Sequence, residues 1–310
     1  NIDEDKAMGV LIAHNPQAGA PLGNTFSIQA ALLYTTSSGV RRIRVHTLCL
    51  PITTSPLLLY QSVDVRTTWN LLVKMAIDRL LQTSLESARS FLMDALVHVL
   101  QNFLNFLTQD QRSANQLLLP DSLLTLPVVI NALLKNPTLR NDADTPPDER
   151  CAYIARAMTV GTANTLQFFH PRLYNLGRTL EMKSPAICIP SQNQLDPASV
   201  YLVDNSFHLA VWVGRRAAPE LLQALFGTQT LKEIEGFAPE NPMNSPVIKL
   251  VEELQQCKHG LGNLPVIIIL QGSSQEKPFV LVNLTEDEAP NSMSYSNFLC
   301  HLHRRIQAAH

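Results

Sequence analysis

Polar and apolar side chains alternate at period two in residues 30–51, and this pattern predicts a β-hairpin. Residues 30–35 form the expected first strand, and the glycine of Ser37-Ser38-Gly39 allows the turn. Pro51 ends the second strand because proline has no N–H to donate. The two faces of the second strand differ: one carries Ile43, Val45, Thr47 and Cys49, and the other carries Arg42, Arg44 and His46. We expect the first face to be buried.

Residues 56–172 have the i, i+3, i+4 spacing of apolar residues that is typical of amphipathic helices. One helix is expected to carry the apolar stripe from Trp69 to Leu81, and a second starts at Ser84. A third follows Pro127, and a fourth runs from residue 148 towards residue 158, with proline and acidic residues at its start. This block is therefore predicted to be all-helical, with four or more helices.

Residues 173–310 begin with a proline-containing linker and then alternate between strand and helix patterns. Strands are expected at 200–204, 207–213, 266–270 and 279–284, and helices at 219–226, 247–257 and 295–306. The continuous apolar run at 266–270 predicts a central strand that is buried on both faces. Strands covered by helices on both faces make an α/β sandwich. The whole chain is thus predicted to be a multi-domain α+β protein.

Charge and composition exclude several classes of protein. The formal net charge is −2, so no whole-chain field draws the protein to nucleic acid. The five cysteines are dispersed without a CxxC pair, which is typical of reduced thiols in the cytosol. No apolar run reaches the ~20 residues that span a bilayer. The glycosylation sequon at Asn283 is interpreted as a chance match.

No catalytic motif is present: the sequence has neither a GxSxG elbow nor a P-loop. Cys300, His301 and His303 lie close together, but on a helix His301 points roughly 100° away from the other two, which makes a poor tetrahedral metal set. Nothing in the sequence orients a base for a Cys-His nucleophile either. We assign no catalytic residue, cofactor site or metal ligand.

Two further features each allow two interpretations. Asp204 could bind calcium with Glu252 or Glu253, because Ca²⁺ prefers carboxylate oxygens, or it could cap the turn at residues 205–206. Arg41, Arg42 and Arg44 could contact acidic lipid headgroups or an acidic peptide, with each basic residue contributing ~1 kcal/mol near such a surface. They could equally be a solvated polar face that discourages pairing at the sheet edge.

Five segments in order carry a family resemblance. They are RRIRVHTLCLP at 41–51, HPRLY at 170–174, VYLVDNSFHLAVWVG at 200–214, PELLQALFG at 219–227 and MSYSNFLCHLHRRIQ at 293–307. With a helical block between the first and second segments, nearly the whole chain resembles the cargo-selecting subunit of the inner COPII coat, the Sec twenty-four family. The sibling GTPase-activating subunit shares this architecture but departs from the pattern at 212–214 and 298–301.

The resemblance implies a C-terminal fragment of a protein with zinc-finger, trunk, β-sandwich, helical and gelsolin-like modules. Residues 1–55 would be the C-terminal part of the β-sandwich, with its other strands upstream of Asn1. The apolar face of the hairpin is therefore expected to be partly uncovered in this chain. Residues 56–172 would be the helical domain, and residues 173–310 a linker plus the gelsolin-like domain. No cofactor is expected in this fragment, because zinc would belong to the missing zinc finger.

The implied function is that of a non-enzymatic COPII coat component and cargo adaptor in transport from the endoplasmic reticulum to the Golgi. It would bind sorting signals on cargo tails at the cytosolic face of the membrane and vesicles. The GTPase-activating subunit would be its partner, mainly through the missing trunk. In the family the hairpin lies near the membrane-facing side, so Arg41, Arg42 and Arg44 are expected to contact acidic membrane or cargo. Alternatives are a calcium-dependent actin regulator and an enzyme that uses Cys300, His301 and His303.

Overall fold

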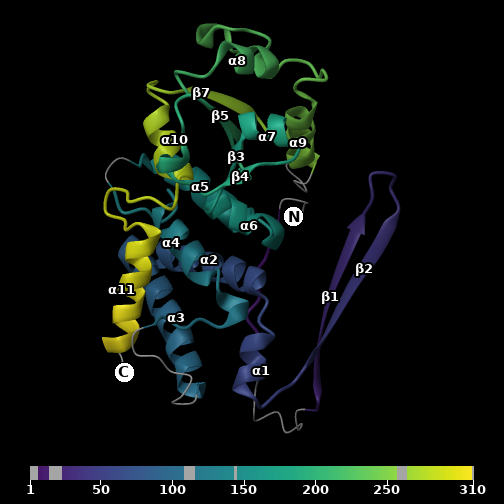
Figure 1. Cartoon of the computed structure of the whole chain (residues 1–310). Coiled ribbons are helices and arrows are strands. Elements are labelled where there is room, and N and C mark those ends of the chain that lie inside the picture. The colour runs from purple at the N-terminus through teal and green to yellow at the C-terminus, as the bar shows by residue number, and fades with distance from the viewer. Residues whose placement is uncertain (1–5, 14–22, 108–115, 143–144, 257–263, 309–310) are drawn as a thin grey trace.

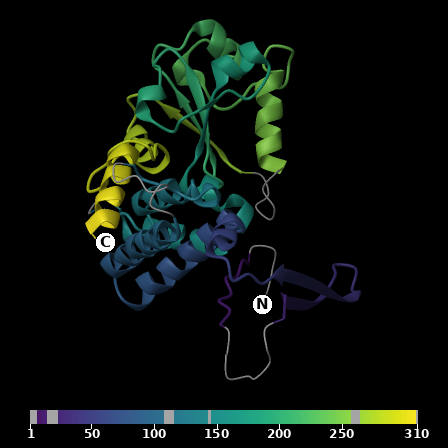
Figure 2. The ribbon, with the colours of Figure 1, turned by 60° about the horizontal axis from the view of Figure 1, so that its bottom comes forward.

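The computed structural model describes residues 6–13, 23–107, 116–142, 145–256 and 264–308. It consists of a hairpin, a helical part and an α/β part that follow one another along the chain (Figure 1). The hairpin extends away from the other two parts in both views (Figure 1 and Figure 2).

The predicted hairpin is confirmed. Strands β1 (Thr25–Thr35) and β2 (Arg41–Pro51) pair antiparallel over their full length. Gly39 has φ +82° in the turn, a conformation that glycine adopts without strain. The apolar face is exposed: Ile43 is 68% exposed and Leu33 on the facing strand is 55% exposed. The burial predicted from the alternation alone is therefore wrong, whereas the partly uncovered face that the resemblance implies is found. No other strand in the described part of the chain pairs with this hairpin or adds to its sheet.

The predicted helices of the second block are also confirmed. The helices are α1 (Pro56–Gln61), α2 (Val65–Gln82), α3 (Leu85–Phe106), α4 (Leu126–Lys135), α5 (Pro147–Thr159) and α6 (Thr162–Phe169), with a 3₁₀ turn at Asp121–Leu123. The Ser84 side chain accepts a hydrogen bond of 3.1 Å from Ser87 N and so caps α3. Leu81 is an exception to the predicted apolar stripe, because it is 66% exposed.

The α/β part is a five-stranded sheet with the order β4-β3-β5-β6-β7. Its strands are β3 (Arg172–Asn175), β4 (Ile187–Cys188), β5 (Val200–Asp204), β6 (Leu209–Val213) and β7 (Val266–Leu270). Only the β6–β7 pair is parallel. Helices α7 (Leu176–Met182), α8 (Pro219–Phe226) and α9 (Ser245–Gln256) share a core with one face, and α10 (Glu276–Asn283) packs on the other (Figure 1). Short 3₁₀ turns lie at Gln192–Gln194 and Leu231–Glu233. The predicted α/β sandwich is therefore confirmed.

Two element assignments in this part are wrong. The run 266–270 forms β7 at the edge of the sheet, not at its centre, and β5 and β6 are the fully buried strands. The predicted strand at 279–284 belongs to helix α10, in which Phe279 and Asn283, four residues apart, are buried on one side. A short apolar run does not distinguish a strand from a buried helix by its pattern alone, which explains both errors.

The last helix, α11 (Tyr295–Ala308), packs against the helical part although it follows the α/β part in sequence. Phe298, Leu302 and Ile306 lie in the same core as α2, α3 and α4. Arg305 Nη2 lies 2.9 Å from Asp94 Oδ1 on α3. The chain therefore returns to the helical part after it has built the sheet (Figure 1).

An acidic loop, residues 285–288, joins the parts at this return. The ammonium of Lys135, at the end of α4, donates to Thr285 O and Asp287 O at 2.6 Å each. His170 Nε2 lies 2.9 Å from Glu286 Oε1, and Ser191 Oγ donates to Asp287 Oδ1 at 2.7 Å. The loop thus contacts residues from the helical part, from the segment that leads into β3, and from the turn after β4.

Candidate functional site

The three arginines lie at the tip of the hairpin, at the start of β2. Arg42 faces Tyr34 across the two strands, and the guanidinium carbon of Arg44 lies 5.8 Å from the centre of the Tyr34 ring. Side chains alternate along a strand, so Arg41 lies on the opposite face, with Ile43. The interpretation of Arg41, Arg42 and Arg44 as one basic face is therefore wrong: two of them share a face.

These arginines have no acidic partner within the described ranges. All three are exposed, and none forms an ion pair with a described residue. The face of Arg42 and Arg44 is also partly apolar near the tip, because exposed Leu32 on the paired strand lies directly opposite Arg44. The tip combines cations that have no ion-pair partner among the described residues with exposed apolar groups. It is therefore suited to bind a surface that carries both anionic and apolar groups.

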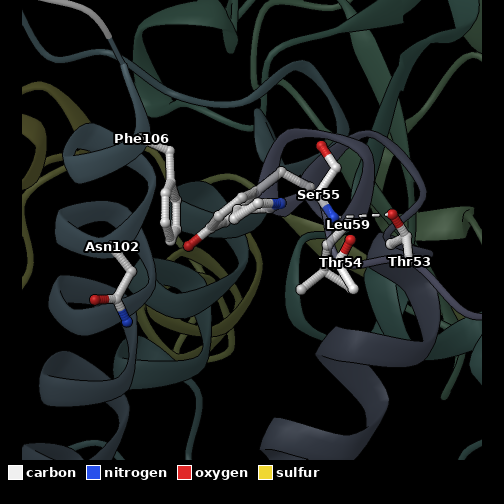
Figure 3. Close-up of a pocket in the computed structure, with 8 residues that line it drawn as sticks. Thr53, Thr54, Ser55, Leu59, Asn102 and Phe106 are labelled. Atoms are coloured by element: carbon white, nitrogen blue, oxygen red, sulfur yellow. Dashed lines mark hydrogen bonds between the residues drawn. The ribbon is translucent and has the colours of Figure 1, made fainter. Parts of the chain in front are cut away.

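A pocket of about 440 Å³ opens at the other end of the hairpin (Figure 3). It is lined by Thr53, Thr54, Ser55 and Pro56 from the linker after β2, Leu59 and Tyr60 from α1, and Asn102 and Phe106 from α3. Asn102 and Phe106 face the linker across the hollow. None of the lining residues is charged, so the pocket suits an apolar or neutral polar group.

The local sequence explains how this pocket is built. Ser55 caps α1, with Pro56 in its first turn, and this fixes where the chain turns from the hairpin into the helix. Tyr60 Oη donates to Val99 O at 2.8 Å and anchors α1 on α3. Sequence reasoning did not find this pocket, although the leucines at 57–59, which are exposed, were a usable signal.

The arginines and the pocket are separate sites. Arg41 and Pro51 are ten positions apart along an extended strand, which at about 3.4 Å per residue is roughly 34 Å. One short side chain cannot reach both. A ligand that uses both would have to be extended along the hairpin.

The other candidates from the sequence do not form sites. Within the described ranges, no three His, Cys, Asp or Glu side chains are placed to hold a metal ion. Asp204 is fully buried and accepts a 2.9 Å bond from Ser206 N, as the turn-capping interpretation predicts. Cys257 lies outside the described residues.

Two further observations concern membranes and glycosylation. No described helix is both long and apolar enough to cross a membrane. Asn283 of the sequon is 2% exposed, and its Oδ1 accepts a bond of 2.9 Å from Asn205 Nδ2. This side chain is therefore part of the packing between α10 and the turn after β5, in agreement with a chance match.

Three family models match the chain in succession. They are the Sec23/Sec24 beta-sandwich domain at residues 1–53, the Sec23/Sec24 helical domain at 64–167 and the Gelsolin repeat at 181–276. This order is that of the hairpin, the helical part and the α/β part. The chain belongs to the Sec24 family. In this family the Gelsolin repeat is one of the standard domains, so its presence is no argument for actin regulation.

Individual Sec24 proteins match over nearly the whole chain. The human "Protein transport protein Sec24D" is 31% identical over 98% of this chain and 30% of its own length. "Protein transport protein SEC24 A" of Arabidopsis thaliana is 30% identical over 91% of the chain and 28% of its own length. A crystal structure of "the human COPII-coat protein Sec24c" superposes with a TM-score of 0.81 at 27% identity, over 91% of this chain and 37% of that one. The chain thus spans about a third of the length of these Sec24 relatives.

Proposed function

We propose that this chain works as part of a non-enzymatic COPII coat adaptor that selects cargo for transport from the endoplasmic reticulum to the Golgi. The observation that supports the proposal most directly is the similarity to Sec24 proteins along almost the entire chain. The adaptor would be cytosolic and would act at the cytosolic face of the membrane and of its vesicles. Its division into domains at 1–55, 56–172 and 173–310 is part of the same proposal.

The hairpin tip would contribute contact with acidic membrane or with cargo. Each of Arg41, Arg42 and Arg44 would contribute about 1 kcal/mol near an acidic lipid surface, so the contact of one chain is weak. A coat presents many copies at once, and their combined avidity would make the attachment stable. The absence of an acidic partner for these arginines among the described residues favours this role.

The pocket at the hairpin base would hold a side chain of a cargo tail. Short tail peptides commonly bind in grooves, where pockets take individual side chains. An uncharged pocket of about 440 Å³ suits an apolar side chain of such a peptide. The adaptor would bind its GTPase-activating partner subunit mainly through the trunk. The trunk and the zinc finger would both lie outside this chain.

Vesicle flotation tests the membrane contact. We expect the wild-type chain to float with vesicles of phosphatidylcholine and phosphatidylserine, and to float poorly with phosphatidylcholine alone. The double variant Arg42→Glu, Arg44→Glu should bind the acidic vesicles roughly tenfold or more weakly, because two favourable contacts become repulsive. Arg41→Glu, on the other face, tests whether the tip binds by one face or by both.

A matched control comes from the exposed pair Arg215 and Arg216 on the α/β part. Reversing both of these charges changes the net charge by the same amount as the hairpin double variant. Flotation of this control should stay close to wild type. If the two double variants lose binding equally, or if neither loses it, the hairpin has no specific membrane role.

A further inference from the structure

Strand β7 has one side without a partner strand. It pairs with β6 in parallel, and no other described strand pairs with its outer side. The bonds from Leu209 N to Pro265 O and from Gln271 N to Val213 O, both 2.9 Å, flank the pairing with β6. The backbone N–H and C=O groups of successive residues in a strand point alternately to its two sides. Because Pro265 and Gln271 bond to β6, Val266 and Ile268 direct their N–H and C=O groups to the open side. An open row of such groups is a template for another strand.

A pocket of about 170 Å³ lies beside this edge, between the α/β part and helix α5. It is lined by Ile267 and Ile269 of β7, Pro278, Phe279, Val282 and Asn283 of α10, Glu149 and Tyr153 of α5, and His208 and Gln275. Ile267 is 37% exposed and lines the pocket, so the pocket lies next to β7 on the side of the sheet that carries α10. Cavities of about 150 Å³ hold a benzene-sized group, so this pocket fits one apolar side chain.

The pocket also has an uncompensated negative charge. Glu149 is half-buried and forms no ion pair with any residue of the described ranges. Burial raises the pKa of Tyr153 to about 12, and the Glu149 carboxylate adds to this rise, so its field acts inside the pocket. Burial lowers the pKa of His208, so this side chain is neutral at pH 7 and does not balance Glu149. Arg140, whose positive charge lowers the pKa of Tyr153, already forms an ion pair with Asp142. A ligand that supplies a positive charge complements this site.

We propose that the outer edge of β7 binds an extended peptide as an added strand, with one Leu- or Val-sized side chain in the neighbouring pocket and a Lys or Arg next to Glu149. Main-chain hydrogen bonds would give the affinity, and the pocket and Glu149 would give the specificity. This surface lies in the α/β part and uses none of the hairpin residues, so the inference goes beyond the adaptor function proposed above and does not depend on it.

The test uses the whole chain and a fluorescein-labelled peptide, Thr-Lys-Thr-Leu-Thr-Lys-Thr, in which both lysines lie on the same face of the strand as the leucine. Fluorescence anisotropy gives the dissociation constant, and amide hydrogen exchange read by NMR locates the binding. We expect the amides of Val266 and Ile268 to exchange more slowly when the peptide is bound. N-methylation of alternate peptide amides should weaken binding at least tenfold, because it removes ladder hydrogen bonds without any change to the protein.

The charge requirement has its own matched pair of variants. Glu149→Gln should weaken binding about fivefold, whereas Asp148→Asn, an exposed neighbour on the same helix, should leave it unchanged. The proposal is overturned by the absence of binding at millimolar peptide, or by binding that leaves Val266 and Ile268 unprotected. It is also overturned if these amides become protected at high protein concentration without peptide, since a second copy of the chain would then be the occupant.

Discussion

Lys135 is the residue at which the burial of a single charge has the clearest consequence. Its side chain is 2% exposed and donates to two carbonyl oxygens of the acidic loop. Burial lowers its pKa from 10.5 to about 8, although the carboxylates of Glu286, Asp287 and Glu288 oppose the shift. Because the pKa of such a group differs between the folded and unfolded states, the free energy of unfolding depends on pH in the range where the group titrates.

The free energy of unfolding is expected to rise between pH 8 and pH 10. In this range the folded state has released the Lys135 proton while the unfolded state still binds it, so increasing pH favours folding. Below pH 8 both states are protonated and the contribution is constant. Lys74, whose pKa is also lowered by burial, adds to the rise, and the raised pKa of Tyr153 opposes it above pH 10.

Urea unfolding at several pH values measures this effect. Lys135→Met should reduce the rise, whereas Lys232→Met, at an exposed position, should leave it unchanged. An unfolding free energy with the same pH slope in wild type and Lys135→Met would contradict the assignment.

At the scale of elements, helix α3 shows how far local sequence signals reach. Ser84 caps the helix through Ser87 N, and the apolar positions that follow form its buried side. The sequence predicted both the start of this helix and its buried face, because a cap and a 3.6-residue period are local properties. Elements 266–270 and 279–284 lacked such a signal: each is a short apolar run whose place depends on its neighbours.

Loss of the cap should destabilise the helical part measurably. Ser84→Ala is expected to lower the free energy of unfolding by about 1 kcal/mol, because the N–H of Ser87 loses its acceptor. Urea unfolding measured by circular dichroism tests this expectation. Ser90→Ala, at an exposed position within the same helix, should be neutral or slightly stabilising. Equal effects of the two substitutions would show that the cap contributes nothing.

At the scale of the whole molecule, α11 ties the end of the chain to its helical part. Leu302 is fully buried in the core shared with α3 and α4. From the sequence we grouped residues 295–306 with the α/β part, because an apolar stripe predicts which side of a helix is buried but not which part of the protein covers it.

Leu302→Ala should destabilise the helical part by about 2–5 kcal/mol, as expected when a large buried side chain leaves a cavity. The two tryptophans allow each part to be followed separately, since Trp69 lies in the helical core and Trp212 in the α/β core. Single-tryptophan variants made with Trp69→Phe or Trp212→Phe report one part each by fluorescence.

Leu302→Ala should shift the unfolding transition followed by Trp69 fluorescence more than the transition followed by Trp212 fluorescence. Leu81→Ala is the matched control, because it makes the same chemical change at a position of the helical part that is 66% exposed. A shift confined to the Trp212 signal would assign α11 to the α/β part instead.

The sequence by itself determined the hairpin and its turn, the helices of the middle block, the α/β class of the last block and, through five ordered segments, the family. These follow from periodicities, caps and turn residues that act over a few positions. Only the tertiary structure decided that β7 is an edge strand, that α11 packs against the helical part, and that pockets open beside α1 and β7. These features depend on contacts between residues that are far apart in the sequence, and no local sequence pattern specifies such contacts.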